Sequence, residues 1–381
     1  MIPVSKLPDS GTTIFTVMSA LADKHDAINL SQGFPDFDGP AELRARVNWH
    51  MEHGHNQYAP LAGVVELREQ IAKKVFDLYG ARIDPSTEVT LTPGATEALY
   101  CAITAVIHPG DEAIVFDPAY DTYDPCIRLN GGVVHHIPMH YPDFCIDWQQ
   151  VADTITDRTR LIMLNSPHNP SGSLLSKNDI RALTKLVANR NIYLVSDEVY
   201  EHIVFDDYRH ESLLWYPELA ARTFAISSFG KTYHATGWRV GYCIAPAPLM
   251  TEFLRIHQFI NFSTNTPIQY ALADFMRDCP GFAAGLGPFY QARRDLFCDL
   301  LESSGFDFAP ASGSFFQLAD YSAISDEPDT EFAKRLTRDH GVAVIPVSVF
   351  YRQPPEQRVI RFCFAKNEDT LREAARRLAA V

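Results

Sequence analysis

One stretch of the sequence is more informative than any other: Ser227-Ser228-Phe229-Gly230-Lys231-Thr232-Tyr233-His234-Ala235-Thr236-Gly237-Trp238-Arg239-Val240-Gly241. It holds a single lysine, Lys231, among small hydroxyl residues and glycines, shortly after the apolar run Thr223–Ile226. An amine near a strand end, with hydrogen-bond donors on either side, is suited to a Schiff base with an aldehyde that carries a phosphate. A lysine taken alone is more often a solvated surface residue, so this interpretation needs support from the rest of the chain.

The size and charge of the chain limit the classes of protein it can belong to. A chain of 381 residues exceeds one typical core, so we expect a large domain and a smaller one. The formal net charge of −14 argues against nucleic acid or an anionic membrane as a partner. A phosphate or carboxylate of a small ligand must therefore bind in a local basic pocket.

Cysteine usage and the first residues bear on the compartment. The seven cysteines are scattered, and no two form a Cys-x-x-Cys pair, which argues against a disulfide framework and against a zinc site. We expect no bound metal. The first nine residues lack the pattern of a secretory signal, and no apolar run is long enough to span a bilayer. We therefore expect a cytoplasmic protein.

From residue 40 to residue 245, short apolar runs alternate with stretches of helical periodicity. The predicted strands are Glu88–Leu91, Ala113–Phe116, Val133–Ile137, Leu161–Leu164, Ile192–Ser196, Thr223–Ile226 and Val240–Ile244. The predicted helices include Ala95–Ile107, Tyr120–Leu129, Lys177–Asn189 and Leu249–Phe259. This alternation indicates an α/β fold with a mostly parallel sheet buried on both faces. Ligands of such sheets bind beyond the carboxyl ends of the strands.

The remaining segments predict a second, smaller domain. Toward the C-terminus we expect a helix at Pro288–Ser303, strands at Ser314–Leu318, Val342–Ile345 and Val359–Phe364, and a helix at Glu368–Ala380. Near the N-terminus, Ile14–Lys24 is predicted as a helix and Ile28–Pro35 as a loop that crosses toward the site. We therefore expect an N-terminal arm with part of the small domain (1–39), a large domain (40–276) and a small C-terminal domain (277–381).

Three polar or aromatic residues follow predicted strands and are candidates for holding a flat, charged ring. Asp197 ends a buried strand, where a carboxylate is costly unless a cation or strong donor meets it. A protonated pyridine nitrogen would be such a partner, and a helix N-cap is the alternative. Asn169 could donate to a phenolate oxygen or serve only its turn. Tyr120 could stack on the ring or be ordinary packing.

A phosphate site can be assembled from three distant segments. The stretch Thr92–Leu99 joins a strand to a helix, and the N–H groups at the start of that helix, with the Thr96 hydroxyl, can bind an anion. This signal is weak alone, because any strand-turn-helix junction looks similar. Ser228 and Arg239 would complete the cradle.

Four motifs in the same order carry a resemblance to a known family. They are Asn165-x-Pro-x-Asn169-Pro-x-Gly172, Ser196-Asp197-Glu198-x-Tyr200, Ser228-x-x-Lys231 with Gly237-Trp238-Arg239-x-Gly241, and Ser31-Gln32-Gly33-Phe34-Pro35-Asp36-Phe37. Over essentially its whole length the chain resembles the class I/II aminotransferases, and within them the methionine and kynurenine branch. The resemblance implies a pyridoxal 5′-phosphate (PLP) enzyme of fold type I, like aspartate aminotransferase. That fold has a large domain with a mostly parallel sheet and a smaller α+β domain.

The resemblance implies a cofactor role for each matching residue. Lys231 forms the Schiff base and later moves a proton, and Asp197 pairs with the pyridine nitrogen. Asn169 and Tyr200 hydrogen-bond the phenolic oxygen, while Tyr120 stacks on the ring. The residues implied to hold the phosphate are Gly94, Ala95, Thr96, Ser228 and Arg239, joined by Tyr58 from the neighbouring subunit of a homodimer with shared active sites.

The substrates implied are an L-amino acid and a 2-oxo acid. Arg361 matches the arginine that clamps the α-carboxylate, with Gly33, Phe34 and Asn169 beside it. The segment Phe259–Pro267 departs from the dicarboxylate-specific branch, because it lacks the arginine that the neighbour supplies there. We therefore expect methionine or an aromatic amino acid as the donor.

A second departure and the rival functions remain open at this stage. The turn Gly94-Ala95-Thr96-Glu97 has fewer glycines than several relatives, which leaves the contribution of Thr96 less certain. A PLP-dependent cysteine-S-conjugate or cystathionine β-lyase on the same fold shares every residue named above. A nicotinamide dehydrogenase is disfavoured, because no Gly-x-Gly-x-x-Gly follows a strand.

Overall fold

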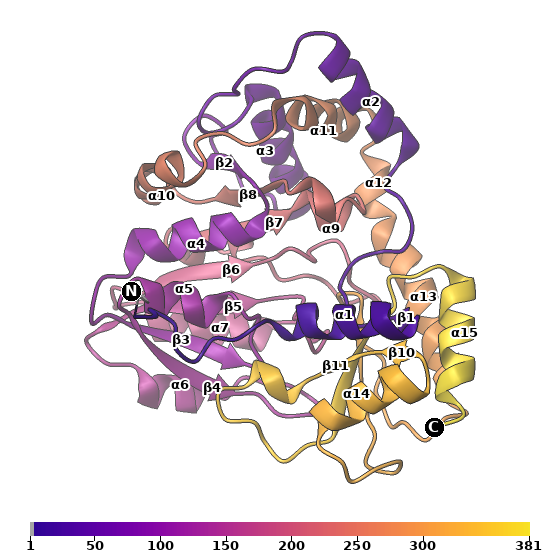
Figure 1. Ribbon diagram of the computed structural model, residues 1–381. Helices are drawn as coiled ribbons and strands as arrows, with labels where there is room; N and C mark the ends of the chain where they lie inside the picture. Colours follow the sequence, from indigo (N-terminus) through magenta and orange to yellow (C-terminus); the bar gives the residue numbers. More distant parts are fainter. Residues whose placement is uncertain (1–3) are drawn as a thin grey trace.

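The computed structural model describes residues 4–381, and its centre is a seven-stranded sheet (Figure 1). The strands, in spatial order, are β2 (Val89–Thr92), β8 (Gly241–Ile244), β7 (Thr223–Ser228), β6 (Tyr193–Asp197), β5 (Thr159–Asn165), β3 (Glu112–Asp117) and β4 (Val133–Pro138). Neighbouring strands are parallel except at β8, which runs antiparallel to both β2 and β7. The mostly parallel sheet predicted from the alternating pattern is confirmed.

Helices cover both faces of this sheet, as the apolar strands require. Because successive side chains of a strand point to opposite faces, Ala113 and Val115 pack on one side and Ile114 and Phe116 on the other. The first face is covered by α4 (Ala95–Val106), α5 (Tyr123–Leu129) and α10 (Ala247–Ile260). The second face is covered by α3 (Val65–Tyr79), α6 (Trp148–Thr154), α7 (Lys177–Val187) and α11 (Thr266–Asp278).

A smaller sheet forms a separate core near the C-terminus. It consists of β11 (Ile345–Pro346), β12 (Val359–Cys363) and β9 (Phe316–Asp320), all antiparallel. The two-residue strands β1 (Ile28–Asn29) and β10 (Val342–Ala343) pair in parallel beside it. Its core also includes side chains of α1 (Ile14–His25), α13 (Leu286–Leu301), α14 (Asp329–Asp339) and α15 (Glu368–Leu378), which surround it in Figure 1.

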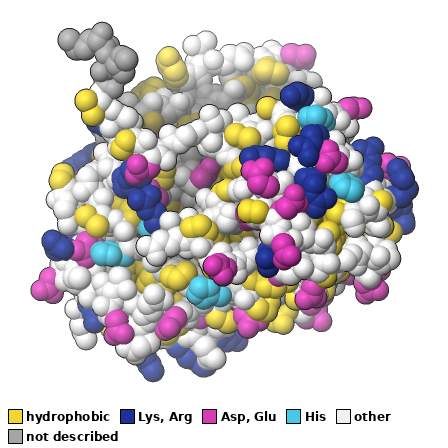
Figure 2. Space-filling view, turned by 60° about the horizontal axis from the view of Figure 1, so that its bottom comes forward, with side chains coloured by type: hydrophobic (Ala, Val, Ile, Leu, Met, Phe, Trp, Pro, Cys, Tyr) yellow, Lys and Arg dark blue, Asp and Glu magenta, His cyan; other side chains and the backbone are white. Residues whose placement is uncertain are grey.

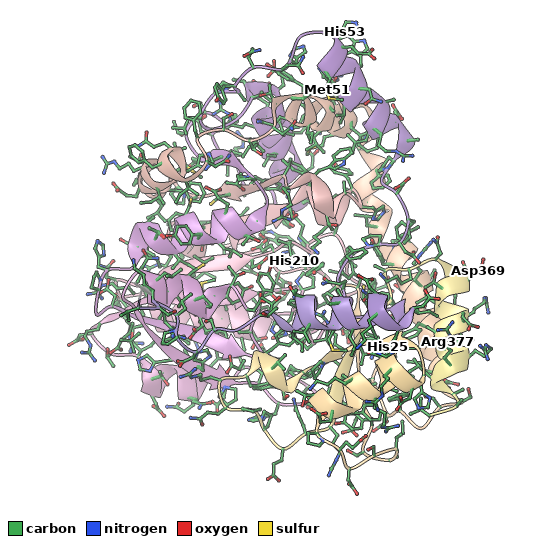
Figure 3. All side chains as sticks on the ribbon, viewed as in Figure 1. His25, Met51, His53, His210, Asp369 and Arg377 are labelled. Atoms are coloured by element: carbon green, nitrogen blue, oxygen red, sulfur yellow. The ribbon has the colours of Figure 1, made fainter. Side chains whose placement is uncertain are left out.

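Several short elements join these layers. The short helices are α8 (Pro217–Ala220), α9 (Phe229–Thr232) and α12 (Gly281–Ala284), and the 3₁₀ turns are η1 (Leu213–Trp215), η2 (Thr236–Trp238) and η3 (Ser348–Phe350). The helix α2 (Ala41–Glu52) lies on α11 at the far end of the molecule, where Figure 3 labels Met51 and His53. His210, by contrast, is buried in the interior.

Two predicted elements need correction. Ile28–Pro35 is not a loop throughout, because its first two residues pair with Val342–Ala343. The strand predicted at Val342–Ile345 is interrupted at Val344, so that β10 joins one sheet and β11 another. The division at residues 39 and 276 stays a prediction, and its first three residues lie outside the described part of the chain.

The surface carries both signs of charge. On the face that Figure 2 shows, Lys and Arg side chains alternate with Asp and Glu side chains. Within residues 4–381, no helix combines the length and apolar character needed to cross a bilayer.

Candidate active site

Strand register brings the predicted site residues to one edge of the large sheet. Asn165 and Asp197 are direct neighbours at the ends of β5 and β6. Gly241, at the start of β8, faces both Thr92 at the end of β2 and Ser228 at the end of β7. Because β8 runs antiparallel, its first residue lies at the edge where its neighbours finish. This reversal is what delivers Arg239, two residues earlier, to the same place.

The turn before α4 forms a tight cradle with Arg239. Gly94 has φ +84°, and a Cβ there would lie 2.6 Å from a terminal nitrogen of the Arg239 side chain. A Cβ on Gly241 would lie 2.8 Å from the backbone nitrogen of Ala95, so Gly241 is required by close approach to backbone, while Gly94 is favoured by its positive φ. The N–H groups at the start of α4 and the Arg239 guanidinium therefore converge on one point, as an anion site requires.

Asp197 is buried on the cavity floor and has no basic partner within salt-bridge distance among the described residues. The Tyr123 hydroxyl donates to its Oδ2 at 2.7 Å, and the Val199 N–H donates to Oδ1 at 3.4 Å. Burial raises the pKa of Asp197 to about 6, while the Tyr123 hydrogen bond acts in the opposite direction. The N-cap alternative is not found, because turns rather than a helix follow β6.

Tyr123 was not predicted as a site residue. Tyr123 belongs to the site, because its hydroxyl, in the first turn of α5, orients the Asp197 carboxylate. The sequence signal that could have identified Tyr123 is its position three residues after Tyr120, shortly after the end of β3. The Asn165 side chain, which donates to the Asp197 carbonyl at 2.9 Å, fixes the backbone of this strand end.

Lys231 is enclosed at the other side of the cavity. Its Nζ donates to the carbonyl of Gly33 at 2.9 Å and lies 5.2 Å from the ring centre of Phe315 and 5.6 Å from that of Tyr200. Burial, together with the charges of Arg361 and Arg239, lowers the pKa of Lys231 to about 8. A free amine is therefore accessible near neutral pH, as a nucleophilic lysine requires.

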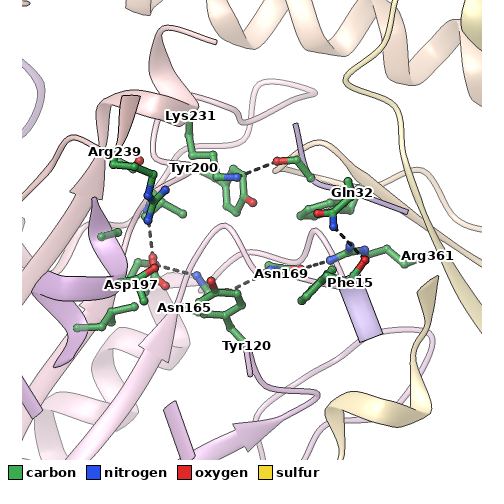
Figure 4. A pocket seen from close by; sticks show the side chains of 17 residues that line it. Phe15, Gln32, Tyr120, Asn165, Asn169, Asp197, Tyr200, Lys231, Arg239 and Arg361 are labelled. Carbon is green, nitrogen blue, oxygen red and sulfur yellow. Dashed lines mark hydrogen bonds between the residues drawn. The ribbon is translucent and has the colours of Figure 1, made fainter. Parts of the chain in front are cut away.

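Arg361 reaches the cavity from β12 of the small sheet and is fully buried. Its Nη1 donates to Oδ1 of Asn169 at 2.7 Å and its Nη2 to the carbonyl of Ser31 at 2.8 Å. The guanidinium carbon lies 3.9 Å from the ring centre of Phe316, which fixes its plane. Burial lowers the pKa of Arg361 to about 10. Figure 4 shows Arg361 across the cavity from Lys231 and Asp197.

Most of the predicted residues line this one cavity. The lining set contains Gly33, Ala95, Thr96, Tyr120, Asn169, Asp197, Tyr200, Ser228, Lys231, Arg239 and Arg361. Three predicted residues do not line it. Gly94 lies behind Arg239, Phe34 lies half-exposed outside, and the Tyr58 side chain is 85% exposed.

Sequence reasoning assigned no site role to several other lining residues. They are Gln32, Leu99, Asn165, Val199 and Phe316. Gln32, Asn165 and Val199 lie inside the quoted motifs, and Leu99 ends the quoted stretch Thr92–Leu99. Leu99 and Phe316 are apolar residues of α4 and β9, and Val199 lies in the turn after β6, so their residue types alone do not separate them from core residues.

The chemistry of this cavity fits pyridoxal phosphate. A helix start and an arginine meet the needs of a phosphate, a buried lysine those of an aldehyde, and a buried carboxylate without a basic partner those of a protonated ring nitrogen. The sequence also matches the model of the family described as aminotransferase class I and II over residues 25–378. The chain belongs to this family.

Similarity to individual members extends over the full length. The chain is 52% identical to methionine aminotransferase of Escherichia coli K12, with 99% of this chain and 98% of that protein covered. A crystal structure from Escherichia coli, described as identifying a methionine aminotransferase function, superimposes with a TM-score of 0.98 over all of both chains at 52% identity. A kynurenine–oxoglutarate transaminase of Dictyostelium discoideum is 31% identical, with 98% and 94% covered.

These findings confirm what the motifs predicted for fold and class of activity. The aminotransferase has the fold of the PLP-dependent type I transferases and depends on pyridoxal phosphate. It transfers an amino group, which favours the aminotransferase over the β-lyase.

Proposed function

We propose that this aminotransferase takes methionine or an aromatic amino acid, such as phenylalanine, tyrosine or kynurenine, as its amino donor. The observation that carries the proposal is the segment Phe259–Pro267, which contains no lysine or arginine for a second carboxylate. Phe259 and Phe262 are exposed there, and the Phe262 ring centre lies 5.5 Å from that of Tyr58. The similarity to a methionine aminotransferase supports the same donor class.

Three residues are assigned to the aldehyde and the ring of the cofactor. When bound, pyridoxal phosphate supplies the electron sink that lets an amino acid lose its α-proton. Lys231 holds the cofactor covalently and then carries that proton, for which a pKa near neutrality is favourable. Asp197 stabilises the positive charge of the ring nitrogen, and Tyr200 hydrogen-bonds the phenolic oxygen.

The remaining cofactor contacts are assigned by position. Tyr120 stacks on the ring and Asn169 donates to the phenolic oxygen. The phosphate is bound by the backbone of Gly94 and Ala95, by the hydroxyls of Thr96 and Ser228, and by Arg239. Tyr58 of a second copy of the chain would complete the phosphate site.

The substrate is assigned to the side of the cavity that faces the small sheet. Arg361 binds the α-carboxylate through its two terminal nitrogens, beside Asn169 and the backbone of Gly33. The Phe15 ring, 5.3 Å from the guanidinium, and Phe34 just outside the cavity would contact an apolar side chain. Such contacts discriminate weakly between donors, because each methylene changes the activation free energy by about 1–3 kcal/mol.

We further propose that the enzyme works in the cytoplasm as a homodimer with shared active sites. The exposure of Tyr58 and Phe259, both 85%, supports this assembly, because exposed large aromatics often belong to an interface. We keep the division into an arm (1–39), a large domain (40–276) and a small domain (277–381) as part of the proposal.

The donor proposal is tested by kcat/KM for methionine, phenylalanine, kynurenine and aspartate with one common oxo acid. Methionine and the aromatic donors should exceed aspartate by about 100-fold or more, because a carboxylate side chain would be left unpaired in the pocket. Aspartate as the best donor would refute the proposal. Pyruvate and ammonia release from cystathionine, measured in parallel, would quantify any β-lyase side reaction.

A further inference from the structure

Three cationic side chains hold three carbonyl groups of one short segment, Ser31–Phe34. Arg361 donates to the Ser31 carbonyl at 2.8 Å, and Lys231 donates to the Gly33 carbonyl at 2.9 Å. The third donor is Lys366, whose Nζ lies 2.9 Å from the Phe34 carbonyl. The segment forms one wall of the cavity, since Gln32 and Gly33 both line it.

Two of these three contacts involve groups that the reaction needs. Under the proposed roles, Lys231 must turn to the cofactor and Arg361 to the substrate carboxylate. Their contacts to the segment are therefore weakened or exchanged when ligands bind. Lys366 touches neither the cavity nor the groups assigned to the cofactor, so its contact with Phe34 is free to persist through the whole reaction.

The surroundings of Lys366 are unusual for a lysine. The residue is only 3% exposed, and no carboxylate lies within 4 Å of its Nζ in the described part of the chain. Its Nζ lies 4.7 Å from the Phe34 ring centre, so both the carbonyl and the ring of one residue face it. Burial of an ammonium group with so few partners costs stability, which points to a role in holding Phe34.

The segment is also anchored on both sides of Phe34. Upstream, the Gln32 side chain donates to the Phe15 carbonyl at 3.1 Å and to the Ser19 hydroxyl at 2.9 Å, both on α1. Downstream, the Asp36 carboxylate accepts from the Asn367 N–H at 2.6 Å at the start of α15. Lys366 holds the carbonyl between these two points, next to the glycine that faces the catalytic lysine.

We propose that Lys366 is a positioning residue. It keeps the segment Ser31–Phe34 against the substrate side of the cavity after Lys231 and Arg361 have released that segment. The proposal rests on the proposed roles of those two residues. Loss of the Lys366 contact should leave phosphate binding intact, because the phosphate cradle lies on the large sheet. It should instead loosen the wall that the substrate meets.

The test compares holoenzyme carrying Lys366→Met with unaltered holoenzyme. We expect KM for methionine to rise about tenfold while kcat and the Kd for pyridoxal phosphate change less than about twofold. Backbone amides of 32–37 should exchange with deuterium about fivefold faster or more, while those of β12 stay protected. The matched control is Lys334→Met, which removes an exposed lysine paired with Glu331 at 2.8 Å on α14.

Rescue separates positioning from general stability. Lys366→Arg keeps a cationic donor and should restore most of the protection of 32–37 and lower KM again. If Lys366→Met yields no folded holoenzyme, Lys366→Leu, which also removes the donor, takes its place with the same expected shifts. Unchanged KM and unchanged exchange of 32–37 in the variants would overturn the inference, whatever happens to Tm. Failure of the proposed function would instead appear in the unaltered enzyme, as an absence of transamination.

Discussion

Burial acts on two reactive residues of the cavity in opposite directions. It lowers the pKa of Lys231 to about 8 and raises that of Asp197 to about 6, because both groups lose solvation of their charged forms. At neutral pH the carboxylate is still mostly ionised, while part of the lysine population is a free amine. Burial in one cavity thus favours a neutral Lys231 amine, which can act as a nucleophile, and leaves an Asp197 carboxylate that can balance a positive charge.

The lysine pKa predicts how cofactor attachment depends on pH. Only the free amine attacks an aldehyde, so the rate at which apoenzyme binds pyridoxal phosphate covalently should rise as pH increases, with a midpoint near pH 8. Stopped-flow absorbance between pH 6 and pH 10 measures this rate. A midpoint near 10.5, the value of an unburied lysine, would contradict the burial argument.

Arg361 should affect all donors equally, because every amino acid carries the α-carboxylate. Truncation of one partner of a desolvated charge pair costs about 2–5 kcal/mol. Arg361→Ala should therefore raise the activation free energy for kcat/KM by this amount, and kcat/KM should fall equally for methionine and phenylalanine. The control is Arg358→Ala, three residues earlier, where an exposed arginine pairs with Asp326. A loss confined to one donor would assign Arg361 to the side-chain pocket instead.

At the scale of elements, the large sheet could be predicted because its strands are visible in the sequence as short apolar runs. β3 and β7 are buried along their whole length, and their central residues, Ala113–Phe116 and Phe224–Ile226, form continuous apolar runs. The strand pair β1 and β10 could not be predicted, since two residues carry no periodicity. Nor could the sequence place Lys366 beside Phe34, because that contact joins positions 332 residues apart.

The site residues also divide into those that local sequence patterns predict and those that only tertiary packing brings to the site. Asn165, Asp197 and Ser228 end predicted strands, and parallel pairing alone brings them together. Tyr123 reaches the Asp197 carboxylate through the packing of α5, and Phe316 reaches the cavity through the packing of β9; no local pattern specifies either position.

His136 offers a test of how β4 is held to its neighbours. Its ring nitrogens lie 2.8 Å from Asp117 of β3 and 3.1 Å from Asp124 of α5. Burial lowers the pKa of His136, but the hydrogen bonds to these carboxylates outweigh it and raise the pKa to about 9. Since the folded pKa exceeds the unfolded value of 6.5, the stabilisation is complete below pH 6.5 and is lost as pH rises through 9.

The expected result is a pH-dependent cost of His136→Gln. The free energy of unfolding should fall by up to about 3 kcal/mol at pH 6, because the pKa is about 9 in the folded protein and 6.5 in the unfolded one, and by much less at pH 9.5. Urea denaturation of both proteins at the two pH values measures the difference. An equal cost at both values would show that the ring acts through packing and not through charge.

At the scale of the whole molecule, the exposed Tyr58 implies a second subunit. Mixing Tyr58→Phe subunits with Lys231→Ala subunits should give hybrid dimers in which the intact lysine meets an intact tyrosine from its neighbour. That site should bind pyridoxal phosphate about tenfold more tightly than the Tyr58→Phe homodimer, since a hydrogen bond to a charged group contributes about 1.5–3 kcal/mol. A fully active monomer at the assay concentration would refute the shared site.

We propose that this cavity removes the amino group of methionine by transamination and passes it to a 2-oxo acid. The most direct measurement incubates holoenzyme with excess L-methionine and no acceptor, and quantifies the oxo acid and ammonia formed. A ping-pong aminotransferase should release about one equivalent of the oxo acid of methionine per subunit and then stop, until a 2-oxo acid is added. Continuous release of ammonia, or no oxo acid at all, would contradict the claim.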